Sequence, residues 1–389
     1  MAWRIPLLLV LVAGFCPAAR SQAAPPAAGP VPFYDLLKWT PPADTATVRH
    51  VRLYSPKLSA FWGKPMHLES MVILPPGFSP EERLPLACFI HGYGNWWTNF
   101  LYFQPRLEAA LADAHRAYPR MIYAFPNAQI PMGHSEFADS VNMGPWGEAF
   151  VDELVPALEA EFGAAAIPSQ RFLTGFSSGG WSSLWIQIQY PTFFGGTWSV
   201  SPDPVDFRYF TGVNIYTFRN MYETPAGEPV MMKRENCTFT TTLRDFVREE
   251  VERFSYGFQF WSFDAVFSPR GPDGRPAFLF DRATGRIDRQ VVRSWRDYDI
   301  RRFLARHWDE LAEVLTGRIH IIVGDCDTYG LDQAVHGLDE TLQGKAGEIE
   351  ILYVPDGTHW LYEGHDDLFP NGLMEHIHRS MATAITPEE

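Results

Sequence analysis

The chain has 389 residues, enough for one large domain with an insertion. Apolar residues make up 46% of it and charged residues 20%, a composition that is typical of a globular protein and excludes disorder of the whole chain. The formal net charge of -14 disfavours nucleic acid and anionic membranes as partners, because both would repel the protein.

The first residues have the pattern of a secretory signal. Arg4 supplies a short positive region, Ile5 to Val12 form an apolar run too short to span a bilayer, and Ser21-Gln22-Ala23 offers small residues for cleavage. We therefore expect a signal peptide at 1–23 and a Pro/Ala-containing linker at 24–46. The mature protein is expected to be secreted or periplasmic, with no membrane attachment.

Three cysteines lie beyond the expected cleavage site: Cys88, Cys237 and Cys326. They are too few for a disulfide scaffold, and they allow one bridge in an oxidising compartment, between a pair that the sequence does not determine. Because no CxxC pair or Cys/His cluster indicates zinc, we expect neither a metal nor a cofactor.

Apolar runs of strand length alternate with helical periods along the rest of the chain. In chain order, strands are expected at 48–53, 67–74, 84–90 and 121–125, then a helix at 148–162, a strand at 171–174, a helix at 181–190 and a strand at 196–199. Helices at 242–254 and 299–315, strands at 319–323 and 349–354 and a helix at 373–381 follow. This alternation predicts an α/β domain over 47–389, with a mostly parallel central sheet and helices on both faces.

The alternation is interrupted between residues 207 and 317. Turns rich in Pro, Gly and Arg, such as Ser268-Pro269-Arg270-Gly271-Pro272, separate the helical stretches there. We interpret 207–317 as a cap-like insertion over the carboxyl edge of the sheet.

A Gly-x-Ser-x-Gly motif, Gly175-Phe176-Ser177-Ser178-Gly179, joins an expected strand to an expected helix. This context is typical of a nucleophile elbow, where glycines allow a turn too sharp for side chains and the serine hydroxyl stands above the sheet. The alternative is an ordinary Gly/Ser turn. We predict that Ser177 is a nucleophile and that the backbone N–H of Ser178 is the first oxyanion donor.

His91-Gly92-Tyr93-Gly94 ends the strand at 84–90, upstream of the elbow. Such a turn can aim a backbone N–H at a developing oxyanion. We predict the N–H of Tyr93 as the second donor, with Gly94 as the alternative. His91 is expected to tether this loop and not to act as the base.

The chain order of an elbow-containing hydrolase is nucleophile, acid, histidine. His359 lies in the loop after the last expected strand and is the predicted base, with His365 as its rival. Asp327 is the predicted acid because it lies further along the loop after the strand at 319–323 than Asp325, the second choice. Asp203, after an earlier strand, is the third choice.

Tryptophans stand next to each of these motifs: Trp96, Trp97, Trp181 and Trp360. They either pack the loops or form a platform for an aromatic acyl group or a sugar ring.

In this order the motifs resemble the putative esterase (esterase D-like) family of α/β-hydrolases, in a secreted bacterial form. The resemblance runs from Val48 to the C-terminus, apart from the insertion, and rests on Tyr54-Ser55-Pro56, Leu74-Pro75-Pro76-Gly77-Phe78, His91-Gly92-Tyr93-Gly94, the elbow, Gly324-Asp325-Cys326-Asp327 and Gly357-Thr358-His359. It implies the α/β-hydrolase fold and carboxylic-ester hydrolysis with Ser177, Asp327 and His359 as a triad.

We therefore expect a serine esterase that works through an acyl-enzyme on small-molecule or polysaccharide-linked esters, with feruloyl or acetyl esters as the hypothesis. Two alternatives remain at this point. The acyl group could be transferred to another alcohol, or the chain could be a non-catalytic binding protein on a hydrolase scaffold, although the intact Ser/Asp/His set favours an enzyme.

Overall fold

The computed structural model describes residues 41–385 except 95, 114, 117, 131, 254–256, 346 and 348. The expected signal peptide and all but the end of the expected linker lie outside the described residues. Within the described part of the chain, no helix has both the length and the apolar character needed to cross a membrane.

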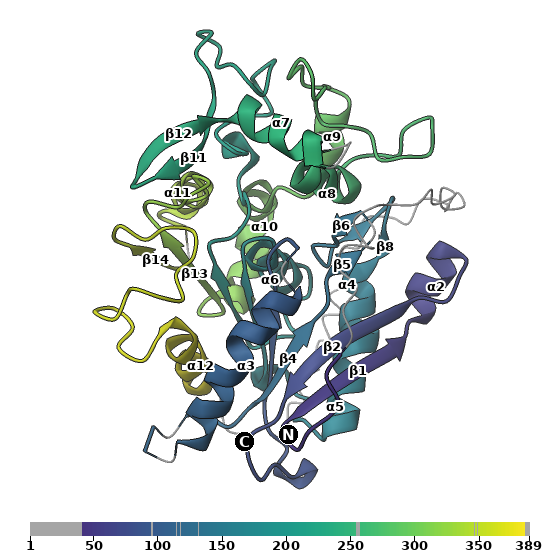
Figure 1. Ribbon diagram of the computed structural model, residues 1–389, viewed down its shortest axis with the longest axis vertical. Helices are drawn as coiled ribbons and strands as arrows, with labels where there is room; N and C mark the ends of the chain where they lie inside the picture. Colours follow the sequence, from purple (N-terminus) through teal and green to yellow (C-terminus); the bar gives the residue numbers. More distant parts are fainter. Residues whose placement is uncertain are drawn as a thin grey trace, which may run out of the picture.

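An eight-stranded sheet with the order β1-β2-β4-β3-β9-β10-β13-β14 forms the centre of the molecule (Figure 1). Its first two pairings, β1 with β2 and β2 with β4, are antiparallel, and the remaining five are parallel. The mostly parallel sheet predicted from the sequence is thus confirmed. The strands are β1 (Val48–Tyr54), β2 (His67–Ile73), β3 (Leu86–Ile90), β4 (Ile122–Pro126), β9 (Arg171–Phe176), β10 (Gly196–Val200), β13 (Ile319–Gly324) and β14 (Glu350–Val354).

Helices cover both faces of this sheet. Along β3, Leu86, Cys88 and Ile90 belong to one apolar core, whereas Ala87 and Phe89 belong to the other, as the two-residue period of a strand requires. The helices of the main domain are α2 (Pro56–Trp62), α3 (Trp96–Ala112), α4 (Trp146–Ala149), a π-helical turn (Phe150–Leu154), α5 (Val155–Phe162), α6 (Ser178–Gln189), α11 (Asp332–Leu342) and α12 (Leu373–Thr383).

Small elements complete the main domain. Two short hairpins precede α4, and they are β5 (Gln129–Ile130) with β6 (Gly133–His134) and β7 (Asp139–Ser140) with β8 (Gly144–Pro145). The short 3₁₀ turns of the main domain are Pro80–Glu82 and Pro168–Gln170, and a third, Phe207–Tyr209, begins the expected insertion.

The expected insertion at 207–317 carries a separate hairpin and several helices. In Figure 1 its hairpin and α7, α8 and α9 gather at one end of the molecule, beyond the ends of the central strands. Its last helix leads back into β13 and supplies the crossover that parallel neighbours such as β10 and β13 need. The elements are β11 (Met231–Glu235), β12 (Thr238–Thr242), α7 (Leu243–Arg253), α8 (Phe258–Phe267), α9 (Val291–Trp295) and α10 (Ile300–Leu315).

Candidate active site

Ser177 lies at the sharp turn between β9 and α6. Its backbone has φ 58° and ψ -121°, a conformation that residues other than glycine rarely adopt and that is found at functional turns. A Cβ atom on Gly175 would lie 1.9 Å from the carbonyl oxygen of Gly179, and one on Gly179 would lie 2.0 Å from that of Ile90. Both glycines of the motif are therefore required by the close packing of backbone at this turn.

The structure brings Ser177, His359 and Asp327 together. His359 Nε2 lies 3.1 Å from Ser177 Oγ, and His359 Nδ1 lies 2.8 Å from Asp327 Oδ2. A neutral imidazole that donates from Nδ1 to Asp327 can accept the Ser177 hydroxyl proton at Nε2. The other oxygen of Asp327 accepts the backbone N–H groups of Tyr329 and Leu331, so this fully buried carboxylate has a fixed orientation.

The loops that carry the acid and the base touch each other, because β13 and β14 are neighbours in the sheet. The backbone N–H of Asp325 donates to the carbonyl of Val354, and that of Cys326 donates to the carbonyl of Gly357. A Cβ atom on Gly324 would lie 2.0 Å from the carbonyl oxygen of Gly357. The two loops therefore pack at a distance that only glycine permits.

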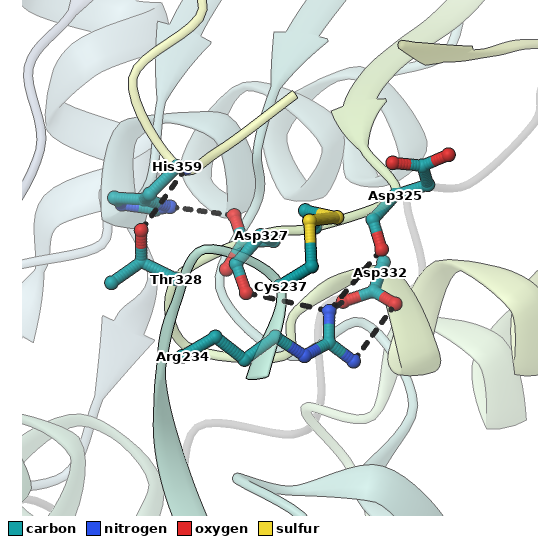
Figure 2. The surroundings of a disulfide bond; sticks show 8 residues. Arg234, Cys237, Asp325, Asp327, Thr328, Asp332 and His359 are labelled. Atoms are coloured by element: carbon teal, nitrogen blue, oxygen red, sulfur yellow. Dashed lines mark hydrogen bonds and ion pairs between the residues drawn. A yellow bond between two sulfur atoms is a disulfide. The ribbon is translucent and has the colours of Figure 1, made fainter. Parts of the chain in front are cut away.

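The other predicted candidates for acid and base occupy different positions. The side chain of Asp325 is exposed and points away from His359 in Figure 2. His365 lies further along the base loop, and the ring nitrogen at Ser177 Oγ belongs to His359.

Asp203, the third candidate for the acid, contacts the nucleophile itself. Its Oδ1 is 3.5 Å from Ser177 Oγ, and its Oδ2 accepts from Ser178 Oγ at 2.5 Å and from Gln259 Nε2 at 3.3 Å. Burial, and secondly the negative charge of Glu136, raise the pKa of Asp203 to about 7, against the lowering effect of the Ser178 hydrogen bond. A second carboxyl group, protonated below neutral pH, therefore lies beside the nucleophile.

The predicted oxyanion loop runs against the elbow. A Cβ atom on Gly92 would lie 3.1 Å from Ser177 Cβ, so the backbone just before Tyr93 is in contact with the nucleophile. The ring of Tyr93 packs edge-on against Phe258, the first residue of α8, at 4.7 Å between centroids. The insertion thus reaches the predicted oxyanion loop.

His91 is buried and bound on both ring nitrogens. The backbone N–H of Ala128 donates to its Nε2 at 2.9 Å, and its Nδ1 lies 2.6 Å from the carbonyl oxygen of Gly92. Burial, and secondly the nearby His134, hold the pKa of His91 well below its usual value, so the ring is neutral and donates from Nδ1. These contacts agree with a tether and leave neither nitrogen available to act as a base.

Two of the four tryptophans lie in the cores. Trp96 is 3% exposed and donates from Nε1 to the carbonyl of Phe125, and Trp181 is 1% exposed and stacks on Trp185. They lie there because α3 and α6 turn these positions toward the sheet. This placement does not support a substrate platform for Trp96 or Trp181.

Trp97 and Trp360 remain partly exposed. The ring of Trp360 packs edge-on against Phe176, the residue before the nucleophile, and against Tyr102 of α3. Trp97 stacks on Phe100, one turn along α3. These two are the aromatic side chains among the four that a substrate could reach.

The sequence motifs did not indicate the contacts that the insertion makes with the site. Gln259 reaches Asp203 from α8, 56 positions along the chain, and a disulfide joins Cys237 to Cys326, the residue before Asp327. These pairs are far apart in sequence and belong to no recognisable motif, so only the fold brings them together.

A family model described as putative esterase matches residues 60–366 of the chain. A search of curated protein sequences finds no match. Similar solved structures include a ferulic acid esterase, which is 13% identical, with 86% of this chain and 98% of that chain covered and a TM-score of 0.52.

Two further structures show the same fold. An S-formylglutathione hydrolase from Agrobacterium tumefaciens is 14% identical, with 88% of this chain and 98% of that chain covered and a TM-score of 0.52. The fluorophosphonate-binding serine hydrolase FphF from Staphylococcus aureus is 12% identical, with 87% and 98% covered and a TM-score of 0.50. Because the family model spans most of the chain, the chain belongs to the putative esterase family and is a carboxylic-ester hydrolase with the α/β-hydrolase fold.

Proposed function

We propose that this protein is a secreted serine esterase that uses Ser177, His359 and Asp327 as its catalytic triad. The position of His359 carries the proposal. Its two ring nitrogens lie 3.1 Å from Ser177 Oγ and 2.8 Å from Asp327 Oδ2, which is the geometry that a nucleophile, a base and an orienting acid require.

In the proposed reaction, His359 Nε2 takes the Ser177 proton as Oγ attacks the ester carbonyl. Asp327 holds the required tautomer and stabilises the imidazolium that forms. The backbone N–H groups of Ser178 and Tyr93 bind the oxyanion, at roughly 3 kcal/mol of transition-state stabilisation each. His359 then protonates the leaving alcohol, and a water molecule activated by the same base releases the acid.

The proposed substrates are small-molecule or polysaccharide-linked esters, with feruloyl and acetyl esters as the first to examine. Support for an aromatic acyl group comes from Trp97 and Trp360, which are both partly exposed, and from the packing of Trp360 against Phe176, the residue before the nucleophile. An aromatic group could pack against such rings in an offset or edge-on arrangement.

An extracytoplasmic location is part of the proposal. The disulfide between Cys237 and Cys326 supports it, because disulfides persist in oxidising compartments. Mass spectrometry of the protein exported by its own signal would test this point. A mature chain that begins after residue 23 supports secretion, and an uncleaved chain retained inside the cell contradicts it.

The decisive experiment measures hydrolysis of p-nitrophenyl esters, from acetyl to feruloyl, by the mature protein and by Ser177→Ala. The matched control is Ser183→Ala, which removes a buried hydroxyl from α6, the helix that begins directly after Ser177. We expect turnover and fluorophosphonate labelling to disappear in Ser177→Ala and to persist in the control. Turnover that survives in Ser177→Ala would refute the assignment of the nucleophile.

A further inference from the structure

The inserted hairpin is covalently joined to the loop that carries the triad acid. Cys237 lies in the turn between β11 and β12, and its disulfide to Cys326 spans 89 positions of sequence. Cys326 is the residue immediately before Asp327. Figure 2 shows the disulfide and the Asp327 carboxylate side by side, with His359 on the far side of Asp327.

Arg234, on β11, adds a second attachment next to the disulfide. Its Nη1 donates to the carbonyl oxygens of Asp325 at 3.3 Å and of Asp327 at 3.5 Å, and to Asp332 Oδ1 at 2.8 Å. Its backbone N–H donates to the carbonyl of Thr328 at 2.7 Å. The side chains of Arg234 and Asp332 are only 11% and 8% exposed, so this ion pair is shielded from solvent.

These contacts complement those made by the rest of the domain. The base loop and its strand bind the N–H groups of Asp325 and Cys326, whereas the hairpin binds the carbonyl groups of Asp325, Asp327 and Thr328. Thr328 Oγ1 in turn accepts the backbone N–H of His359 at 3.4 Å. The hairpin therefore holds one side of the peptide that determines where Asp327 meets His359.

We propose that the hairpin β11–β12 positions Asp327 through Arg234 and the Cys237–Cys326 disulfide, so that reduction of this disulfide lowers turnover. The inference rests on the proposed function, because it takes Asp327 as the triad acid. Arg234 is a positioning residue in this scheme, since it acts on the reaction only through Asp327. A displacement of about 1 Å at such a group can cost a factor of about 10² in rate.

The disulfide is accessible to a soluble reductant, because Cys237 is exposed and Cys326 is partly exposed. A dithiol would break the S–S bond in two exchange steps. Its first thiolate forms a mixed disulfide and releases one cysteine, and its second thiolate closes a cyclic disulfide and releases the other. Two electrons and two protons pass from the dithiol to the protein. The remaining described cysteine, Cys88, is buried and stays apart from this exchange.

The first experiment compares the oxidised, reduced and reoxidised mature protein on p-nitrophenyl acetate, with dithiothreitol as the reductant. Thiol counting in the native state should rise by two on reduction. We expect kcat to fall by about ten- to a hundredfold, KM to change by less than about threefold, and reoxidation to restore kcat. Unchanged kcat in protein with two new thiols would overturn the proposal.

A second experiment separates positioning from general loosening of the structure. Asp327→Asn should retain residual turnover, about 10⁴-fold below the wild type. If the disulfide acts through Asp327, reduction of Asp327→Asn should leave this residual turnover unchanged, because effects of groups that act as a unit are not additive. A further fall as large as in the wild type would show that the disulfide acts elsewhere.

Substitution of Arg234 tests the same attachment without a reductant. Arg234→Gln combined with Asp332→Asn removes the cation without leaving a buried carboxylate unpaired. We expect this double variant to have a lower kcat at unchanged KM. Arg234→Lys alone keeps the charge but lacks the planar fork, so its kcat should fall less. The matched control is Arg244→Gln, which removes an exposed arginine that pairs with Glu223 in the same insertion.

Two outcomes are thereby distinguished. A lower kcat in the double variant Arg234→Gln/Asp332→Asn, with the kcat of Arg244→Gln unchanged, supports the positioning role. Equal kcat values in the wild type, the double variant and Arg244→Gln contradict it. Fluorophosphonate labelling of Ser177 reports on the proposed function separately. Without labelling in the oxidised wild type, the proposed function fails and not merely the positioning role.

Discussion

The buried carboxyl group of Asp203 predicts a specific dependence of stability on pH. Its folded-state pKa is about 7, whereas an aspartate in an unfolded chain has a pKa of about 3.9. Because the folded pKa is raised, the stabilising contribution is complete below about pH 3.9 and is lost as the pH rises through about 7. Between pH 5 and pH 8 the loss amounts to roughly 2 to 3 kcal/mol of unfolding free energy.

Asp203→Asn removes this dependence, because asparagine resembles the protonated acid in shape and cannot ionise. We expect the free energy of unfolding of Asp203→Asn relative to the wild type to rise by about 2 to 3 kcal/mol from pH 5 to pH 8. Urea unfolding of both proteins at four pH values between 5 and 8, monitored by tryptophan fluorescence, measures this difference in unfolding free energy. The other carboxyl groups that titrate in this range cancel in the difference between the two proteins.

Asp325→Asn serves as the control, since its side chain is exposed and lies on the acid loop. Its difference from the wild type should stay within about 0.5 kcal/mol at all four pH values. A flat difference for Asp203→Asn over the same range would show that the carboxyl group beside Ser177 is not held in its protonated form, and the electrostatic account of the site would then be wrong.

Three further predictions concern the elbow, the disulfide and the aromatic side chains. Gly175→Ala should abolish ester turnover, because its Cβ would lie 1.9 Å from a backbone oxygen, whereas Gly227→Ala, with open space around its Cβ, should cost about 1 to 2 kcal/mol of stability and leave turnover intact. Reduction of the disulfide, which closes a loop of 89 positions, should lower the free energy of unfolding by up to about 5 kcal/mol, measured by urea unfolding with and without dithiothreitol. Trp97→Ala and Trp360→Ala should raise KM for feruloyl esters more than for acetyl esters, with Trp62→Ala on α2 as the control, and equal changes for both esters would argue against an aromatic acyl site.

The sequence predicted the parts of the fold that have a short-range signal. The strands of the central sheet were expected close to their observed positions. The signal is plainest in β3 and β4, which are compact apolar runs next to Pro or Gly. The helix α3 was not expected, since its apolar residues are interrupted by polar residues and by Pro105. The short α8 was also missed, because it is apolar on nearly all sides and lacks a helical period.

The site residues differ in the same way in how far a short-range signal in the sequence indicates them. Ser177 and His359 were predicted as nucleophile and base because a Gly-x-Ser-x-Gly turn and a loop after the last strand have fixed places in this chain order. The choice between Asp325 and Asp327 could not be made from alternation, since the strand has ended there. It depends on a loop shaped by contacts with Gly357 and with the hairpin, both distant in sequence.

The insertion touches both sides of the proposed triad. Through Gln259 it contacts Asp203, which lies against the nucleophile, and through Cys237 it is bonded to the residue next to Asp327. A cap attached at only one edge could change its sequence to suit a new ester without disturbing the reacting groups. Here a change in the cap that moves α8 or the hairpin also moves groups in contact with Ser177 or Asp327. Substitutions in this insertion should therefore alter kcat as well as substrate preference, in contrast to substitutions at the exposed positions of α12.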